Sequence, residues 1–318
     1  MNVLSLFDGM SCGQLALQRA NIPYDNYFAS EVDKWAIKVT QANHADTTQL
    51  GDVSQVYAKD LPPIDLLIGG SPCQGFSLAG NQLAFDDPRS QLFFEFVRLL
   101  KECKPKYFLL ENVRMKKEWQ AIISEYLGVE PIMINSSLVS AQNRVRYYWT
   151  NIPGVRQPKD KGVKLSDVYD PNVEDKYDCT ESVISRVLDT KRGKGYFYNP
   201  LTHDKIGIVI AGYNKHPTGG CYIECGASRG RYNDDGSTSQ QIEIRKDDKT
   251  NALTTVQKDN LLIADRTKYR RLTPLECERL QTVPEGYTSC VSDTQRYRML
   301  GNGWTVDVIT HIFKNMEL

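Results

Sequence analysis

Residues 3–20 read VLSLFDGMSCGQLALQRA. Val3 to Phe7 form a short apolar run typical of a β-strand, Asp8 to Gly13 supply a glycine-bearing turn, and Gln14 to Ala20 are helix-compatible. A turn of this kind lets the backbone approach a ligand beneath the N-terminus of the following helix. The segment lacks the full dinucleotide fingerprint, so it predicts a strand–turn–helix unit without yet identifying a ligand.

The first 150 residues repeat this alternation of short apolar runs and longer helix-compatible segments. Strands of this length that are separated by about 20 residues or more need right-handed crossover connections, which favour a parallel, doubly wound sheet. We therefore predict an α/β, Rossmann-like core with ligands at the carboxyl ends of the strands. The predicted strands are Val3–Phe7, Tyr27–Glu31, Ile64–Gly69, Tyr107–Leu110, Ile132–Asn135 and Tyr147–Thr150, and helices are expected at Gln91–Cys103 and Thr305–Phe313.

The chain is long enough for one large or two unequal domains, with 318 residues of which 41% are hydrophobic. Helical periodicity fades from about Pro158 to Leu262 and resumes at Thr273-Pro274-Leu275-Glu276, which has the N-cap, first-turn proline and capping-box glutamate of a helix start. We predict a sheet-bearing domain over residues 1–172 that is completed by 292–318. Residues 173–291 are predicted to form a smaller, irregular domain with a hinge.

Several protein classes are disfavoured by composition. The apolar runs are far shorter than the roughly 20 residues of a transmembrane helix, and the chain opens into a strand without a basic leader, so we expect an intracellular protein without membrane contact. The eight cysteines are scattered, which fits reduced thiols. Cys221 and Cys225 have no second Cys/His pair at metal-site spacing, so no metal is predicted.

Positive charge is concentrated in the middle of the chain, although the formal net charge is zero. Between Arg186 and Arg231 there are eight Lys/Arg and three acidic residues, interleaved with tyrosines. Such a segment is either a solvated surface or a face that contacts phosphates and bases.

Two carboxylates follow the second and third elements. Glu31 closes a predicted strand 24 residues after Phe7, near the offset at which an acidic residue accepts both hydroxyls of a ribose. Asp52, in Gly51-Asp52-Val53, has the chemistry to accept a hydrogen bond from an adenine amino group. Each carboxylate alone could equally be an exposed loop residue, but their order after the glycine turn favours a nucleoside site.

Cys73 lies in Gly69-Gly70-Ser71-Pro72-Cys73-Gln74-Gly75-Phe76-Ser77, immediately after an apolar strand. A structural thiol would be expected inside the strand, whereas proline and flanking glycines present this one in a turn at the strand end. By itself this arrangement leaves a nucleophile and a buried structural thiol as alternatives. The polar Gly75–Arg89 segment that follows has the composition of a loop beside the thiol.

Another strand ends in Glu111-Asn112-Val113, on the same predicted sheet edge as Cys73. The run Gln142-Asn143-Arg144-Val145-Arg146 precedes a further strand, and its two arginines share one face if the segment is extended. A thiol and a carboxylate are thus expected at one edge of the sheet, and the two arginines are expected on one face of the extended segment before the next strand.

At this point the chain resembles the cytosine-C5 DNA methyltransferases. The resemblance covers nearly the whole chain except the middle hundred residues. It rests on an ordered set of motifs: Phe7-x-Gly9, Glu31, Asp52, Pro72-Cys73-Gln74, Glu111-Asn112-Val113, Gln142-x-Arg144-x-Arg146, the helix from Arg271-Leu272-Thr273-Pro274 to Gln281, and Gly301-Asn302.

The resemblance implies catalysis by Cys73, Glu111, Arg144 and Arg146. Cys73 would add to C6 of cytosine and so make C5 nucleophilic. Glu111 would stabilise charge at N3 and the exocyclic amine, and Arg144 would bind O2 and orient Glu111. The base would be flipped out of double-stranded DNA, with the Gly75–Arg89 loop closing over it and the middle domain reading the sequence.

The implied methyl donor is S-adenosyl-L-methionine, which leaves as S-adenosyl-L-homocysteine. The residues that the resemblance assigns to it are Phe7, Asp8, Gly9, Ser11, Gly13, Glu31, Val32, Asp52, Val53, Pro72, Asn302, Gly303 and Trp304. Those assigned to the substrate are Gln74, Ser77, Asn112 and Gln142.

Three positions depart from the common family pattern. Ser11 replaces a second glycine, Val32 replaces an aromatic residue, and Gly303-Trp304 replaces Ser-Val or Ala-Val. The first and last also look like the eukaryotic de novo branch. With no recognisable histone-reading or zinc module, the chain is closer to a compact bacterial or phage enzyme, for which we expect a monomer and, in a restriction–modification setting, a separate cognate endonuclease.

Three alternatives are open at this stage. A transfer-RNA cytosine-C5 methyltransferase would use the same motifs, and a thymidylate synthase-type enzyme shares the attack of cysteine on C6. A DNA-binding protein with a decayed methylase core is a third, disfavoured because Cys73, Glu111, Arg144 and Asn302 are all present.

Overall fold

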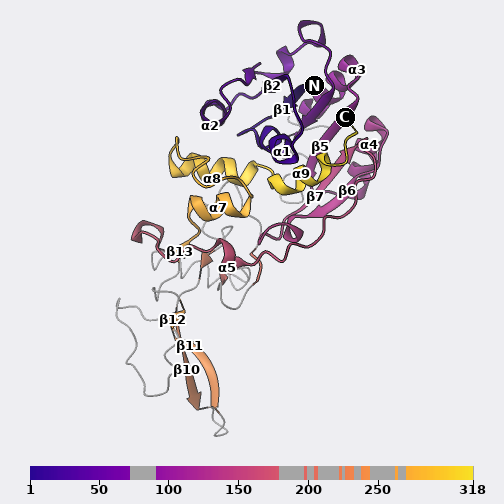
Figure 1. Ribbon diagram of the computed structural model, residues 1–318. Helices are drawn as coiled ribbons and strands as arrows, with labels where there is room; N and C mark the ends of the chain where they lie inside the picture. The colour runs from indigo at the N-terminus through magenta and orange to yellow at the C-terminus, as the bar shows by residue number, and fades with distance from the viewer. Residues whose placement is uncertain are drawn as a thin grey trace.

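A seven-stranded sheet with helices on both faces forms the body of the molecule (Figure 1). The computed structural model describes residues 1–71, 91–178, 204–206 and 270–317, together with the backbone of short strands between 197 and 263. The strand order is β3-β2-β1-β4-β5-β7-β6. The strands are β1 (Asn2–Leu6), β2 (Asn26–Ser30), β3 (Thr48–Gln49), β4 (Leu66–Gly69), β5 (Tyr107–Val113), β6 (Ile132–Asn135) and β7 (Val145–Thr150).

The prediction of a parallel sheet needs one correction. β1 to β5 pair in parallel, but β7 is antiparallel to both β5 and β6. The reason is the short connection between β6 and β7, residues 136–144, which contains only the 3₁₀ turn η5 (Ser136–Leu138). A parallel crossover needs a dozen or more residues, so this connection reverses the chain direction.

Helices cover both faces of the sheet. The α3 and α4 helices pack on one face, and α1, α2, α7, α8 and α9 contribute to the core on the other. Their bounds are α1 (Cys12–Ala20), α2 (Lys34–Asn43), α3 (Gln91–Cys103), α4 (Lys117–Leu127), α5 (Leu165–Val168), α7 (Pro274–Leu280), α8 (Asp293–Asn302) and α9 (Val306–Phe313). Further 3₁₀ turns are η1 (Val53–Gln55), η2 (Ala58–Asp60) and η6 (Asp175–Tyr177).

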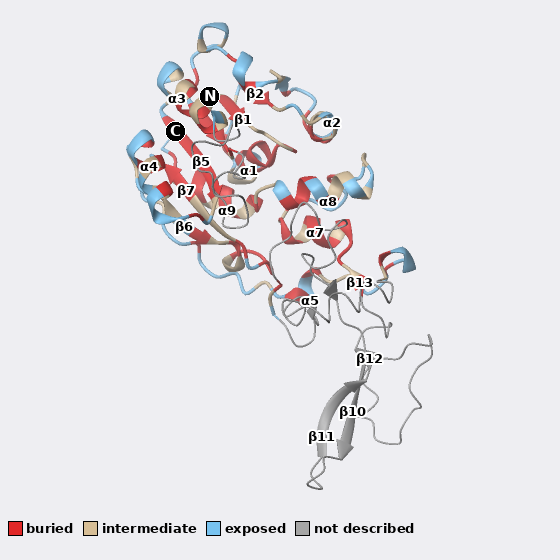
Figure 2. Ribbon diagram, turned by 180° about the vertical axis from the view of Figure 1, so that it is seen from behind, coloured by how far each residue is buried: buried red, intermediate tan, exposed pale blue. Residues whose placement is uncertain are grey.

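Alternate residues of the central strands enter two separate hydrophobic clusters. In β4, Leu66 and Ile68 join the cluster under α1 and α9, whereas Leu67 joins the cluster under α3 and α4. Such alternation follows from the two-residue side-chain period of a strand, and burial on both faces explains the continuous apolar runs. Figure 2 shows the resulting buried layer along the sheet.

The local predictions hold closely. The predicted Gln91–Cys103 helix is α3, and Thr273 caps α7 as expected, with its hydroxyl accepting from Glu276 N–H and the Glu276 side chain reaching back to the cap. Within the described residues, no helix has the length and hydrophobicity needed to cross a bilayer.

The region predicted to be a second domain contributes strands whose backbone is described. β10 (Gly226–Tyr232) pairs with β11 (Thr238–Glu243) and β12 (Leu262–Ile263), while β9 (Tyr222–Ile223) pairs with β8 (Phe197–Tyr198) and β13 (Arg270–Arg271). The basic Arg186–Arg231 surface and Cys221 and Cys225 otherwise lie outside the described residues.

The last part of that region packs on the sheet-bearing body. Leu272, Cys277 and Tyr287 belong to the same hydrophobic cluster as β1 and α9. The Tyr287 hydroxyl donates to Met10 O at 2.8 Å and lies 3.0 Å from His44 Nε2. The segment from β13 to Tyr287 is therefore continuous with the core that holds the turn after β1.

Candidate active site

A cavity of about 550 Å³ opens where β1, β2, β4 and β5 end. This volume lies within the roughly 300–1,000 Å³ of small-molecule sites, and the carboxyl edge of the strands is where α/β folds bind ligands. Its lining includes these residues singled out from the sequence: Phe7, Asp8, Gly9, Glu31, Val32, Asp52, Val53, Glu111, Asn112, Arg144, Arg146, Asn302, Gly303 and Trp304. Fourteen residues from six separate motifs thus share one cavity.

The turn after β1 is held in an unusual backbone conformation. Phe7, Gly9 and Ser11 have φ of 57°, 60° and 62°, the left-handed region that bulky residues such as Phe rarely adopt. Asp8 N–H donates to Ser30 O at 3.2 Å, so the end of β2 helps to fix the turn. Strain supported by its surroundings is typical of functional turns.

Glu31 connects the turns that follow β1 and β2. Its Oε2 accepts from Gly9 N–H at 2.8 Å, and its Oε1 accepts from the N–H groups of Val32 and Asp33, also at 2.8 Å each. A carboxylate has about four acceptor positions, so three backbone bonds leave capacity for a ligand hydroxyl. Glu31 therefore fixes the shape of the cavity wall in addition to its predicted role toward a ribose.

Asp8 places a poorly satisfied carboxylate in the cavity wall. Its Oδ1 accepts from the Tyr27 hydroxyl at 2.8 Å, whereas Oδ2 is buried and has no hydrogen-bond partner among the described residues. Burial raises the pKa of Asp8 to about 6. A buried acceptor without a partner is costly, so this oxygen favours a cationic ligand group in the cavity.

Hydrogen bonds from α3 hold the part of the cavity wall that contains Asp52. Asp52 Oδ1 caps η1 by accepting from Ser54 N–H at 2.9 Å. Arg98 Nη2 donates to Val53 O at 3.2 Å and to Val56 O at 2.8 Å, and the same guanidinium pairs with Glu95 and Glu102. This part of the cavity is therefore tied to the helix that follows the Cys73 segment.

Glu111 is a nearly buried carboxylate at the end of β5. Its Oε2 accepts a hydrogen bond from Trp304 Nε1 at 3.1 Å. Arg146 Nε lies 2.9 Å from Oε1, although this N–H is not aligned into a hydrogen bond with any described residue. Both side chains of the ion pair are only 10–11% exposed, so solvent screens the attraction between the two charges only weakly.

Arg144 lies beside the chain segment that precedes Trp304. The resemblance implies that Arg144 orients Glu111; among the described residues, the ion pair with Glu111 comes from Arg146. The Arg144 guanidinium donates to Gly301 O at 3.2 Å and to Gly303 O at 3.0 Å. Burial lowers the pKa of Arg144 to about 9, which leaves it protonated at neutral pH and able to hold these two carbonyl groups.

Asn112 links the end of β5 to the start of the Cys73 segment. Its amide Nδ2 donates to Ser71 Oγ at 3.2 Å, and its Oδ1 accepts from Val113 N–H at 2.8 Å. Ser71 is the last described residue before residue 91. Pro72, Cys73, Gln74, Ser77 and the Gly75–Arg89 loop lie outside the described residues.

Three predicted site residues do not line the cavity. Ser11 is fully buried with its hydroxyl on Gln14, and it caps the start of α1. A Cβ at Gly13 would lie 2.4 Å from Ile68 Cδ1, so the glycine is required for packing of α1 on β4. Gln142, also fully buried, donates to the carbonyl oxygen of Leu280, the last residue of α7, at 3.3 Å.

Several residues of the lining were not predicted from the sequence. Arg298 and Met299 precede Asn302 by four and three positions on α8, so helical spacing from Asn302 would have indicated them. Arg298 Nη1 lies 3.2 Å from Asp33 Oδ2 across the rim. The remaining residues of the lining are Met10, Cys12, Ser30, Asp33, Ala36, Gly51, Gly70, Ser71, Leu92, Val113 and Gly301.

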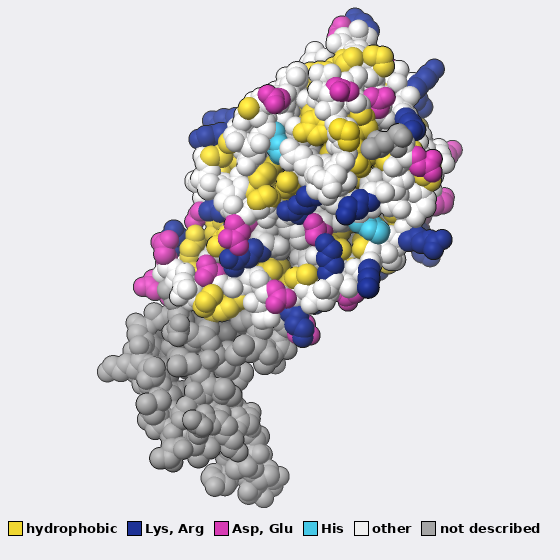
Figure 3. Space-filling model, in the orientation of Figure 1, with side chains coloured by type: hydrophobic (Ala, Val, Ile, Leu, Met, Phe, Trp, Pro, Cys, Tyr) yellow, Lys and Arg dark blue, Asp and Glu magenta, His cyan; other side chains and the backbone are white. Residues whose placement is uncertain are grey.

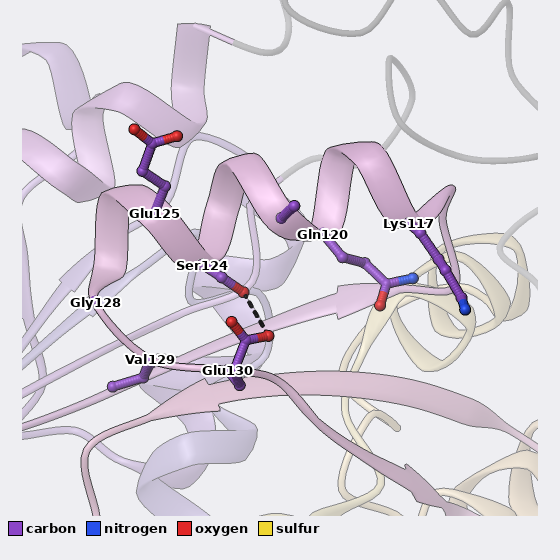
Figure 4. Close-up of a pocket in the computed structure, with 8 residues that line it drawn as sticks. Lys117, Gln120, Ser124, Glu125, Gly128, Val129 and Glu130 are labelled. Atoms are coloured by element: carbon purple, nitrogen blue, oxygen red, sulfur yellow. Dashed lines mark hydrogen bonds between the residues drawn. The ribbon is translucent and has the colours of Figure 1, made fainter.

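A second hollow, on α4, does not bring together residues from several motifs as the first cavity does. Lys117, Gln120 and Glu125 lie along its rim and Ser124 Oγ is 3.4 Å from Glu130 Oε2 (Figure 4). The face seen in Figure 3 carries side chains of both charges over its described part. Neither feature brings together groups that suit a defined reaction.

Comparison with known proteins identifies the family. The family model described as C-5 cytosine-specific DNA methylase matches residues 1–318. The chain belongs to the C-5 cytosine-specific DNA methylase family. Its family, its Rossmann-like fold class, its assignment as a DNA (cytosine-5-)-methyltransferase and its use of S-adenosylmethionine, all predicted from sequence, are thereby confirmed.

Bacterial and phage methyltransferases are among the similar proteins. The chain is 30% identical to the type II methyltransferase M1.ScrFI of Lactococcus lactis subsp. cremoris, over 99% of this chain and 77% of that protein. It is 28% identical to the orphan methyltransferase M.SPRI of Bacillus phage SPR, over 99% and 97% of the two chains.

Solved structures share the fold. The Entamoeba histolytica methyltransferase EhMeth matches with a TM-score of 0.73 and 18% identity, over 99% of this chain and 97% of that one. S. pombe Dnmt2 methyltransferase matches with a TM-score of 0.68 and 20% identity, over 98% and 97%.

Proposed function

We propose that this C-5 cytosine-specific DNA methylase acts on a cytosine flipped out of double-stranded DNA, through a covalent bond from Cys73 to C6. The observation that carries the proposal is that one cavity is lined by two groups of residues, one suited to a base and one suited to a methyl donor. Glu111 with its arginine lies on one side, and the turn after β1 with Asp8, Glu31 and Asp52 lies on the other. A base and a methyl donor must meet in such a space.

The residues of the cavity fit S-adenosylmethionine. Asp8 Oδ2, which has no partner among the described residues, suits the ammonium group of its methionine end. Glu31 has acceptor capacity for the ribose, and the carboxylate of Asp52 can accept a hydrogen bond from the adenine amine. When bound, the cofactor supplies a sulfonium methyl group as the electrophile. We propose that six further residues of the lining contact the cofactor: Phe7, Gly9, Val32, Val53, Asn302 and Gly303.

Covalent catalysis by the chain overcomes the low reactivity of C5. Cys73 thiolate adds to C6, which converts the ring into an enamine whose C5 is nucleophilic. Glu111 stabilises charge that develops at N3 and the exocyclic amine. After methylation, loss of the C5 proton restores the double bond and expels Cys73; water is our candidate for the base.

Other segments of the chain give access to the base and recognise the DNA sequence. C5 is unreachable inside a duplex, so the nucleotide has to leave the stack. We assign closure over the base to the Gly75–Arg89 loop, substrate contacts to Gln74, Ser77 and Asn112, and groove contacts to the basic, tyrosine-rich region within residues 173–291. The enzyme is proposed to act as a monomer inside a bacterial cell, with any cognate endonuclease as a separate protein.

Bisulfite sequencing tests this proposal directly. The chain is expressed in a bacterial host that lacks cytosine-C5 methylation, and the host genome is sequenced after bisulfite conversion. We expect protected cytosines in one short sequence context. With purified protein, labelled methyl transfer to duplex DNA should greatly exceed transfer to RNA. Unmodified genomic cytosines together with methylation of RNA would overturn the proposal.

Asp8 should make cofactor binding depend on pH. The ionised carboxylate attracts the cofactor ammonium, and in the free protein its pKa is about 6. Affinity for S-adenosylmethionine should therefore be full near pH 8 and fall as the pH drops below about 6. Asp8→Asn should weaken binding about tenfold at pH 8 and flatten the pH dependence. Isothermal titration calorimetry measures both.

The free protein provides a second check with the opposite sign. Because the pKa of Asp8 is raised from 3.8 to about 6 on folding, ionising it destabilises the free protein as the pH rises through this interval. Asp8→Asn should remove that loss in urea unfolding. Asp46→Asn, at an exposed carboxylate, is the matched control and should change neither measurement. Wild-type affinity that stays constant from pH 5 to pH 8 would contradict the role given to Asp8.

A further inference from the structure

Trp304 forms a direct contact with the carboxylate of Glu111. The indole N–H is a donor only, and it points at Glu111 Oε2 across 3.1 Å. Within the described residues, this is the only hydrogen bond made to the Glu111 side chain, because the N–H of Arg146 is close but not aligned. The indole therefore fixes the Oε2 side of the carboxylate, opposite the Oε1 that is paired with Arg146.

The backbone leaves room for this contact at Gly70. A Cβ at Gly70 would lie 3.0 Å from Trp304 Nε1 and 3.2 Å from Glu111 Oε2, tighter than ordinary contact with both members of the pair. The ring itself extends to α1, where a Cβ at Gly13 would lie 3.5 Å from Trp304 Cζ3. The indole thus fills the space between the helix after the cofactor turn and the residue that holds the base.

Arg144 fixes the position of this tryptophan. Its guanidinium binds the carbonyl groups of Gly301 and Gly303, three residues and one residue before Trp304 in the chain. The Thr305 hydroxyl on the other side donates to Gln281 Oε1 at 2.9 Å. With a residue held on each side of it in the chain, the indole has a defined position from which to hold Glu111.

We propose that Trp304 is a positioning residue for Glu111, and that Arg144 acts on Glu111 through it. This inference rests on the proposed function, since it gives Trp304 a part in the chemical step rather than in cofactor binding alone. A preset carboxylate direction favours the transition state because no reorganisation is needed as charge develops on the base.

Trp304→Phe tests the proposal because it keeps an aromatic ring and removes the donor. We expect kcat to fall about tenfold or more, while the Kd of S-adenosylmethionine changes less than about threefold. Trp304→His, which restores a ring N–H, should recover part of kcat. Trp149→Phe is the matched control: it removes an indole bond to Ser124 Oγ of 3.0 Å in the core, away from the cavity, and should leave kcat near the wild-type value.

A double-mutant cycle shows whether Trp304 acts through Glu111. In a Glu111→Gln background, Trp304→Phe should cost less than about twofold in kcat, because the negative charge that the indole orients toward the base is already lost. Three outcomes would overturn the inference: an unchanged kcat in Trp304→Phe, equal losses in kcat and cofactor affinity, or additive effects in the cycle. Each variant is compared with wild-type enzyme that is active on DNA. If the wild type itself transfers no methyl group to DNA, the proposed function is overturned, and this inference with it.

Discussion

Cys73→Ala should lose methyl transfer to DNA almost completely, by about 10⁴-fold or more in kcat. Without the thiolate, C6 has no nucleophile and C5 remains unactivated. Binding of S-adenosylmethionine should be unchanged, since the groups proposed to hold it come from other strand ends. Tritiated methyl transfer and calorimetry provide the two measurements.

A trapping experiment distinguishes loss of the nucleophile from misfolding. In duplex DNA that carries 5-fluorocytosine at the target, fluorine cannot leave C5 as a proton does, so the bond to Cys73 persists and the adduct appears on a denaturing gel. Wild type should form the adduct and Cys73→Ala should not. Cys103→Ala removes a half-buried thiol of α3 and should behave as wild type. Full activity in Cys73→Ala would disprove the assignment.

Glu111→Gln should lower kcat by about 10²–10³-fold, the usual effect of removing one preorganised electrostatic contact. The amide keeps the shape of the side chain but loses the charge that faces Arg146 and the base. Formation of the 5-fluorocytosine adduct should slow to a similar extent, because attack on C6 is the step that Glu111 assists. Single-turnover methyl transfer measures the effect.

Stability has to be followed in the same variant. Glu111→Gln leaves the largely buried Arg146 without its counter-charge, so some loss in urea unfolding is expected. Glu118→Gln, at an exposed position of α4, controls for the substitution itself. A Glu111→Gln protein that is folded and fully active would exclude the carboxylate from the chemical step.

Much of the cavity could be predicted because its residues follow strand ends. Apolar runs fixed where β1, β2 and β5 would end, and parallel strands bring their carboxyl ends to one edge. Phe7, Glu31 and Glu111 could therefore be placed together from local patterns. The reversed β7 was missed because the prediction took the spacing of the earlier crossovers as general, although residues 136–144 are too few for one.

Side-chain partners were not predictable in the same way. Ser11 and Gly13 are in the motif but serve α1 packing, which depends on Ile68 of another strand. The bond from Trp304 to Glu111 joins residues 193 positions apart, and no local pattern reports such a distance.

The sequence by itself determined the α/β class, the edge of the sheet that carries the site, the family and the order of its motifs, because these depend on local periodicity and on residue types at short spacing. Only the tertiary structure decided that Arg146 pairs with Glu111, that Arg144 holds Gly301 and Gly303, and that Trp304 meets the carboxylate. The physical reason is that side-chain direction follows from how β7, α8 and β5 pack together. Hydrogen bonds are short-ranged and directional, so a small change in that packing would exchange one partner for another.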